Sequence, residues 1–239
     1  MPTDASRNSL GGMVDGVLAE YALLNETGAI RVPEHLSYEE AATLPCAALT
    51  AWNTVVETGC VRAGETVAIL GTGGVSCFGL VFAKMHGAFV FMTSSSDEKL
   101  ARGKALGADA LINYKTMPDW DQEIRKRTGA GVDHVIEVGG ANTLEKSMNA
   151  VRPGGSIYLI GALAGVGSIN PRMINRKGIR LQGIHVGSRD MFANMNRAIA
   201  QHGLKPAIDR VFAFEDAKAA YAHQHGAGHF GKIVIVMAP

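Results

Sequence analysis

Residues 66–76 read Thr-Val-Ala-Ile-Leu-Gly-Thr-Gly-Gly-Val-Ser, an apolar run that passes directly into a glycine-rich turn. The apolar run predicts a strand covered on both faces, and the residues after the turn have helical periodicity. Gly71 would permit a tight turn, and Gly73 would let main-chain N–H groups approach a diphosphate at the helix N-terminus. Ser76 stands where a third glycine is usual, and Gly79, one turn later, could still allow close packing of helix on sheet.

Apolar runs and helical patterns alternate from about Glu65 to Val186. This alternation predicts a doubly wound, mainly parallel sheet, the α/β Rossmann arrangement. Gly87 and Gly107 fall just past two of the helices, where a left-handed residue is favoured. The predicted strands are Thr66–Leu70, Ala88–Met92, Ala110–Tyr114, His134–Val138, Ser156–Ile160 and Ile179–Val186, and the predicted helices are Ser76–His86, Asp97–Leu106, Met117–Thr128 and Asn142–Val151.

The two ends of the chain have a different pattern. Val17–Leu23 is a strand candidate, and Ser37-Tyr38-Glu39-Glu40 is a capping-box sequence that predicts a helix start. Helices are predicted at Asp190–His202 and Glu215–His225, followed by a terminal strand at Lys232–Met237. These flanks are predicted to be parts of a second domain that packs against the Rossmann unit. They are too short to form that second domain alone.

Composition limits the classes of function. The 239 residues are 47% hydrophobic and 19% charged, with a net charge of +1. The chain therefore has no overall electrostatic field that would favour binding to nucleic acid or to an anionic membrane. Cys46, Cys60 and Cys77 form no CxxC pair, which suits a reducing compartment. The first ten residues show no signal-peptide pattern, and the longest apolar stretch, Phe78–Met92, is interrupted by charge. We expect a cytoplasmic protein that spans no membrane.

The end of the second strand predicts which dinucleotide is preferred. A site for NAD would place an acid there to bind the ribose 2′-hydroxyl, whereas this chain has Thr93-Ser94-Ser95-Ser96 before Asp97. Hydroxyls, N–H groups at the next helix start and Lys99 could instead surround a 2′-phosphate. The pattern therefore favours NADPH. The alternative is that Ser96 is simply an N-cap and Lys99 a solvated charge.

Several segments in combination resemble one known family. These segments are residues 41–52 (AATLPCAALTAW), 71–75 (GTGGV), 94–100 (SSSDEKL), 105–109 (ALGAD), 151–155 (VRPGG) and 231–234 (GKIV). The chain resembles the medium-chain dehydrogenase/reductase superfamily from about Gly11 to Met237, and within it the zinc-independent quinone-oxidoreductase-like and alcohol-dehydrogenase-like branch.

The resemblance implies a division of the chain and a set of cofactor-binding residues. Residues 1–44 would be a remnant of a β-rich GroES-like catalytic domain, 45–187 the Rossmann domain, and 188–239 a segment that returns to the catalytic domain. Family members often form dimers, so a homodimer is expected through the strand near Arg180–Val186. The implied cofactor-binding residues are Gly71, Thr72, Gly73, Gly74 and Val75 for the diphosphate, Ser95, Ser96, Lys99 and Tyr114 for the 2′-phosphate, and Gly139, Ile160, Gly161, Val186, Ser188 and Lys232 around the ribose and nicotinamide.

The chain begins at what resembles the middle of the family's catalytic domain. Roughly the first hundred residues of that region would precede it, an amount of chain in the size range of a small domain. Substrate-pocket residues and any first two zinc ligands would lie there, so the dinucleotide site is expected to be present and a complete active site is not.

Zinc is not expected. Cys46 matches a catalytic zinc ligand of zinc-dependent relatives, but a catalytic site needs three protein ligands, and no second thiolate or suitable histidine is near it in sequence. A cysteine in a Leu-Pro-Cys-Ala turn is more often a small buried apolar group. His223, His225 and His229 precede the last strand in a glycine-rich region, without a carboxylate or thiolate at ligand spacing, and are expected to be surface residues.

The favoured hypothesis is an oxidoreductase that transfers hydride between NADPH and a small carbonyl, quinone or activated alkene. Two alternatives remain open: a zinc-dependent alcohol dehydrogenase, and a non-catalytic NADPH-binding protein. No motif identifies a general acid, so the sequence predicts no catalytic residue.

Overall fold

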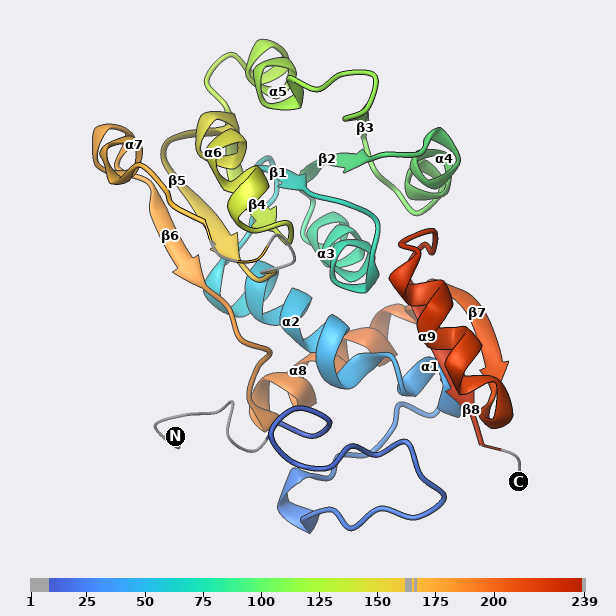
Figure 1. Cartoon of the computed structure of the whole chain (residues 1–239). Coiled ribbons are helices and arrows are strands. Elements are labelled where there is room, and N and C mark those ends of the chain that lie inside the picture. The colour runs from blue at the N-terminus through green and yellow to red at the C-terminus, as the bar shows by residue number, and fades with distance from the viewer. Residues whose placement is uncertain (1–8, 162–164, 166, 238–239) are drawn as a thin grey trace.

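The computed structural model describes residues 9–161, 165 and 167–237, and its centre is a six-stranded parallel sheet (Figure 1). The strand order is β3-β2-β1-β4-β5-β6. The strands are β1 (Thr66–Ile69), β2 (Phe89–Ser94), β3 (Ala110–Asn113), β4 (Val132–Glu137), β5 (Val151–Leu159) and β6 (Arg180–Gly183). The order reverses between β1 and β4, and ligands bind at such switch points in open α/β sheets. The predicted doubly wound parallel sheet is confirmed.

Helices cover both faces of this sheet. Along β1, Val67 and Ile69 enter one apolar cluster, whereas Ala68 and Leu70 enter the other, which explains why the strand sequence is apolar throughout. The first cluster is covered by α2 (Leu49–Trp52), α3 (Gly74–Met85), α4 (Asp97–Ala105) and α8 (Arg189–His202), and the second by α5 (Trp120–Thr128), α6 (Ala141–Ala150) and α7 (Pro171–Lys177). Gly87 and Gly107 have positive φ just past α3 and α4, as expected.

Among the elements that differ from the sequence prediction are the last strand of the sheet and helix α7. The last strand of the sheet ends at Gly183 rather than Val186, and Val186 itself has a φ of +48°, which is outside the β region. Helix α7 was not predicted, although Pro171 at its first turn and left-handed Gly178 after its end are the usual start and stop signals. The Lys177 ammonium donates to the carbonyls of Met148, Asn149 and Val151, and so caps the end of α6.

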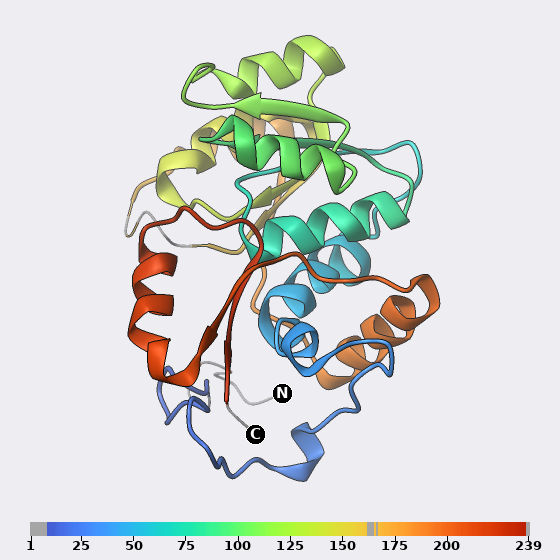
Figure 2. The same ribbon diagram turned by 90° about the vertical axis from the view of Figure 1, so that its right-hand side faces the viewer.

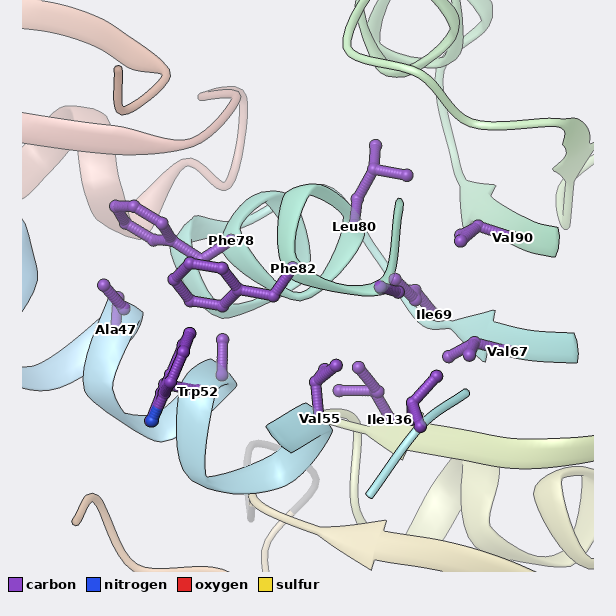
Figure 3. Packing of buried hydrophobic residues seen from close by; sticks show 14 of the residues in the cluster. Ala47, Trp52, Val55, Val67, Ile69, Phe78, Leu80, Phe82, Val90 and Ile136 are labelled. Carbon is purple, nitrogen blue, oxygen red and sulfur yellow. The ribbon is translucent and has the colours of Figure 1, made fainter. Parts of the chain in front are cut away.

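Residues 44–58 are helical, so the expected turn at Leu-Pro-Cys-Ala was wrong. Two π-helical stretches, Leu44–Ala48 and Asn53–Thr58, flank α2 without a break. Figure 3 shows Trp52 beside Phe82 of α3, where the two rings meet edge to face at a centroid distance of 5.3 Å. Phe78 stacks on Phe82 at 6.1 Å. The proline is tolerated because it lies in the first turn of this helix.

The C-terminal strands form a small separate sheet beside the glycine-rich turn. β7 (Ile208–Ala213) pairs in parallel with β8 (Lys232–Val236), and α9 (Ala217–His225) connects them (Figure 2). β7 was not predicted. Just before β8, the Gly231 N–H donates to the Thr72 carbonyl at 2.9 Å, so the chain's end is tied to the turn after β1.

The N-terminal part of the chain differs most from expectation. The predicted strand at Val17–Leu23 is wrong, because these residues are exposed and no neighbouring strand hydrogen bonds to them among the described residues. The predicted capping box is confirmed: the Ser37 hydroxyl and the Glu40 carboxylate each accept the other residue's N–H at the start of α1 (Tyr38–Ala41). The first eight residues, on which the signal-peptide expectation largely rests, lie outside the described residues.

No helix in the described part of the chain combines the length and apolar character needed to cross a membrane.

Candidate functional site

The glycine-rich turn joins β1 to α3 at the centre of the sheet. Gly71 has a φ of +71°, which a residue with a Cβ rarely adopts, and α3 begins at Gly74 without a side-chain cap. The first N–H groups of a helix lack intrahelical acceptors, so this helix start can accept an anion. Ser76, in place of the usual glycine, donates its hydroxyl hydrogen to the Leu70 carbonyl at 2.7 Å and so holds the turn closed.

Gly79 lies on the side of α3 that packs against the sheet. A Cβ at this position would lie 2.9 Å from a terminal carbon of Ile136 on β4. The sequence prediction that Gly79 permits close helix–sheet packing is therefore supported by the geometry.

A first cavity, the strand-end cavity, lies on one side of this turn and has a volume of about 400 Å³. It is formed at the carboxyl ends of the central strands and the starts of α5 and α6. Three residues predicted from the sequence, Gly71, Tyr114 and Gly139, line it. Its other lining residues are Leu70, Thr93, Pro118, Trp120, Val138, Asn142, Thr143 and Lys146.

A second cavity, the helix-start cavity, lies on the other side and has a volume of about 700 Å³. Gly74, Val75 and Lys232 line it, as does Cys46. A Cβ on Gly74 would lie 2.5 Å from Cδ of Lys232, so the lysine stem fills the space that this glycine leaves. Cys46 is exposed to this cavity, which corrects the expectation of a buried apolar cysteine. The buried thiol is Cys77, and burial raises its pKa to about 12.

The predicted 2′-phosphate residues lie together at the ends of β2 and β3. Asn113 pairs with Ser94, and the Tyr114 N–H donates to the Ser94 carbonyl at 3.0 Å, so both strand ends meet. Ser96 is the N-cap of α4, where its hydroxyl accepts the N–H of Lys99 at 3.3 Å. The Lys99 ammonium donates to the Ala227 carbonyl at 2.9 Å. The N-cap alternative for Ser96 is thus observed, and Lys99 is half-buried rather than fully solvated.

A buried carboxylate, which sequence reasoning missed, organises the loop after β4. Glu137 is fully buried, and its Oε1 accepts N–H groups of Gly139 and Gly140 at 2.7 and 3.1 Å and the Thr143 hydroxyl at 2.6 Å. Its Oε2 accepts the Ser147 hydroxyl. This loop lines the strand-end cavity. The signal in the sequence was an acid at the end of a strand, one residue before two glycines.

The four remaining predicted residues follow β5 and β6 and line neither cavity. Ile160 and Gly161 donate their N–H groups to the Glu137 carbonyl. The Val186 carbonyl accepts the side-chain amide of Asn53 at 2.8 Å, which holds its strained backbone in place. Ser188 is the N-cap of α8, so its hydroxyl already accepts a main-chain N–H.

The three histidines near the last strand are not equivalent, which corrects the expectation of three surface residues in a loop. His223 and His225 belong to α9, and His223 Nε2 contacts Asp209 Oδ2 at 2.9 Å. Burial would raise the pKa of Asp209, but hydrogen bonds from His223, Arg102 and the Phe230 N–H outweigh it and lower that pKa to about 2. His229 follows the helix and lines the helix-start cavity.

The described residues do not fit a zinc site. No three of their His, Cys, Asp or Glu side chains gather at metal-binding distance, and a catalytic zinc needs three protein ligands. They fit a nicotinamide dinucleotide better, because an uncapped helix start lies between two cavities at the switch point of the sheet.

Comparisons with known proteins agree with this geometry. The zinc-binding dehydrogenase family model matches residues 74–201. A zinc-type alcohol dehydrogenase-like protein of Schizosaccharomyces pombe is 45% identical over 98% of this chain and 70% of its own length. A quinone oxidoreductase of Sus scrofa is 29% identical over 94% of this chain and 70% of its own length.

Solved structures show the same likeness. A chain from Sinorhizobium meliloti assigned as an alcohol dehydrogenase superposes with a TM-score of 0.90 at 45% identity, covering 95% of this chain and 67% of that one. An NAD-dependent alcohol dehydrogenase superposes with a TM-score of 0.89 at 35% identity, covering 96% and 67%.

The fold, the glycine-rich turn and these matches together define a dinucleotide-binding dehydrogenase. The chain belongs to the zinc-binding dehydrogenase family of the medium-chain dehydrogenase/reductase superfamily, and it covers the C-terminal part of that family. It is an oxidoreductase of this class.

Proposed function

We propose that this protein transfers hydride between NADPH and a small carbonyl, quinone or activated alkene. The observation that carries the proposal is the uncapped start of α3 at the switch point of the sheet, with the strand-end cavity on one side and the helix-start cavity on the other. A dinucleotide needs this arrangement, because its diphosphate lies between two bulky ends. Bound NADPH would supply the hydride, and the protein would supply position and electrostatics.

Each part of the chain has a defined task in this proposal. The adenosine would lie in the strand-end cavity, where Tyr114, Val138 and Gly139 offer an aromatic and apolar lining. The diphosphate would lie at the start of α3, and the nicotinamide in the helix-start cavity beside Cys46 and Lys232. The substrate would approach the nicotinamide from the same cavity.

The preference for NADPH rests on the segment after β2. Residues 93–96 are Thr-Ser-Ser-Ser, and the first acid, Asp97, accepts the side-chain amide of Asn113 at 2.7 Å. A carboxylate facing a 2′-phosphate would repel it, whereas hydroxyls and the ammonium of Lys99 can bind one. Lys99 would exchange its contact with the Ala227 carbonyl for a phosphate oxygen, a stronger charge-assisted bond.

A turnover assay tests the function. The purified protein is mixed with NADPH or NADH and a panel containing a quinone, an aldehyde and an α,β-unsaturated ketone, and nicotinamide absorbance is followed with and without added zinc. We expect NADPH oxidation with one acceptor class at least, without a requirement for zinc. Turnover that depends on zinc would favour the alcohol dehydrogenase alternative. Tight NADPH binding without any oxidation would favour a binding protein.

We also propose a homodimer through β6. This strand is at the edge of the sheet, pairs with β5 on one side, and has Arg180, Gln182 and Gly183 exposed. Unpaired edge strands favour pairing with a second copy. Sedimentation velocity should give a dimer for the wild type and a monomer when Gln182 is replaced by proline, which removes a main-chain donor. A monomeric wild type would contradict this proposal.

A further inference from the structure

The loop that precedes β8 lies between the starts of α3 and α4 and carries a histidine without an assigned task. At one end of the loop, the Ala227 carbonyl accepts the Lys99 ammonium of α4. At the other end, the Gly231 N–H donates to the Thr72 carbonyl of the glycine-rich turn. The loop therefore connects the two places where phosphate groups are proposed to bind, and His229 is near its middle.

His229 has a buried nitrogen that the fold leaves unsatisfied. Its Nδ1 is inaccessible to solvent and has no hydrogen-bond partner among the described residues. Buried polar atoms are nearly always paired, and an exception in a native structure calls for a specific explanation. The same residue lines the helix-start cavity together with Gly74 and Val75, the first residues of α3. His229 therefore has an unused polar nitrogen on the lining of the cavity at that helix start, and a turn of its ring would present Nδ1 to a ligand there.

The charges around His229 favour an anionic partner. Lys99 of α4, Lys232 of β8 and His223 of α9 face it with positive or protonatable groups, and Asp209 of β7 is the facing carboxylate. Asp209 is already engaged, because it accepts Arg102, His223 and the Phe230 N–H. The remaining field at this end of the cavity is positive, which suits a phosphate oxygen.

We propose that His229 is a positioning residue for the dinucleotide, whose imidazole donates a hydrogen bond to the diphosphate at the start of α3. This inference rests on the proposed function and adds a contact from the C-terminal segment to it. The diphosphate is common to NADH and NADPH, so His229 contributes to binding of both. Lys99, in contrast, contributes to the choice between them.

A proton should accompany this contact. In the protein alone, burial lowers the pKa of His229, and the charges of Lys99, His223 and Lys232 add to that effect against the opposing charge of Asp209. A diphosphate beside the ring would stabilise its protonated form. Binding would then take up a proton, so affinity should be highest at low pH and fall as pH rises from the lowered pKa of His229 in the free protein to its higher pKa in the complex.

The test measures NADH affinity by calorimetry between pH 5.5 and 8, about the range in which histidine titrates. NADH is the better probe because it lacks the 2′-phosphate monoester, which itself titrates near pH 6. The variants are His229→Ala, which removes the contact, and His229→Asn, which keeps a donor and removes the titration. The matched control is His225→Asn, because His225 is exposed at the end of α9, just before the loop that carries His229.

We expect His229→Ala to weaken NADH and NADPH about equally, by about tenfold at pH 6, which corresponds to about 1.4 kcal/mol. His229→Asn should recover part of this affinity and show a flatter pH profile, and the control should match the wild type. The inference is overturned if His229→Ala binds both dinucleotides like the wild type, if it weakens NADPH alone, or if His229→Asn keeps the full pH profile. A wild type that binds neither dinucleotide would refute the proposed function, and this inference with it.

Discussion

Replacement of Glu137 is the perturbation whose size can be worked out most fully from the structure. The carboxylate is completely buried and accepts four hydrogen bonds, three at Oε1 and one at Oε2. The Glu137→Ala substitution would leave two main-chain N–H groups and two hydroxyls without that acceptor. Each buried unsatisfied donor costs about 1–3 kcal/mol, and partial relaxation or a water molecule recovers some of it. We expect a loss of about 4 kcal/mol in the free energy of unfolding.

Glu137→Gln separates the hydrogen bonds from the charge. The amide oxygen can occupy the place of Oε1 and keep its three donors, while the amide nitrogen faces the Ser147 hydroxyl, which can turn and accept. Neutral hydrogen bonds are roughly half as strong as charge-assisted ones, so the expected loss is about 1–2 kcal/mol. The control is Glu145→Ala, which removes an exposed acid on α6, and it should change stability by less than about 0.5 kcal/mol.

Urea unfolding monitored by tryptophan fluorescence gives these values, provided that the slope m is unchanged. For a chain of this size, Glu137→Ala should also lower Tm by roughly 8–16 °C. The affinity for NADPH should also fall in Glu137→Ala, because the loop that Glu137 holds in place lines the strand-end cavity. The reasoning would be refuted if Glu137→Ala lowered the free energy of unfolding by less than about 1 kcal/mol, which is about the typical effect of a single mutation. Equal damage from alanine and glutamine would show that charge, and not hydrogen bonding, holds the loop.

Three further predictions concern other parts of the fold. Gly161→Ala would place a Cβ 1.8 Å from the Val138 carbonyl oxygen, so we expect a loss of about 3 kcal/mol by urea unfolding, against no loss for Gly28→Ala, where the space is open. Asp209→Asn should lower the free energy of unfolding by about 2 kcal/mol at pH 7, because the pKa of Asp209 is about 2 in the folded protein and 3.8 in the unfolded chain. The stabilisation from the ionised carboxylate is fully present above pH 3.8 and is lost as pH falls through 2. The gap between that variant and the wild type should therefore narrow in unfolding experiments below about pH 4, and a constant gap would contradict the assignment. Lys177→Met should lower Tm by roughly 2–6 °C, because three carbonyls at the end of α6 lose their donor, and an unchanged Tm would show that water replaces it.

Much of the fold was predictable because local and global signals agree in the Rossmann unit. The β1 sequence is apolar on both faces, the glycine-rich turn follows it at once, and the glycines after α3 and α4 mark the helix ends. The short β7 was missed because Ile208–Ala213 mixes charged and apolar residues without a period that a single sequence reveals. The strand expected at Val17–Leu23 failed because a short, largely apolar segment does not form a stable strand without a partner.

The site was less predictable, because its key contacts depend on how the loops and helices around it fold, and one of them joins residues far apart in the sequence. Glu137 was recognisable as an acid at a strand end, but its four donors come from the loop and helix that follow. The exposure of Cys46 follows from the helix that carries it, and the short motif around it suggested a turn instead. The contact between Lys99 and Ala227 spans 128 positions, which no local pattern encodes.

The measurement that tests the central claim most directly is a paired calorimetric titration of the purified protein with NADPH and NADH, repeated on Lys99→Ala. The account predicts that NADPH binds at least about tenfold more tightly, a difference of about 1.4 kcal/mol, and that most of this preference disappears in the variant. Equal affinities in the wild type, or a preference for NADH, would contradict the assignment of the segment after β2 to a 2′-phosphate. Binding of neither dinucleotide would contradict the assignment of the glycine-rich turn itself.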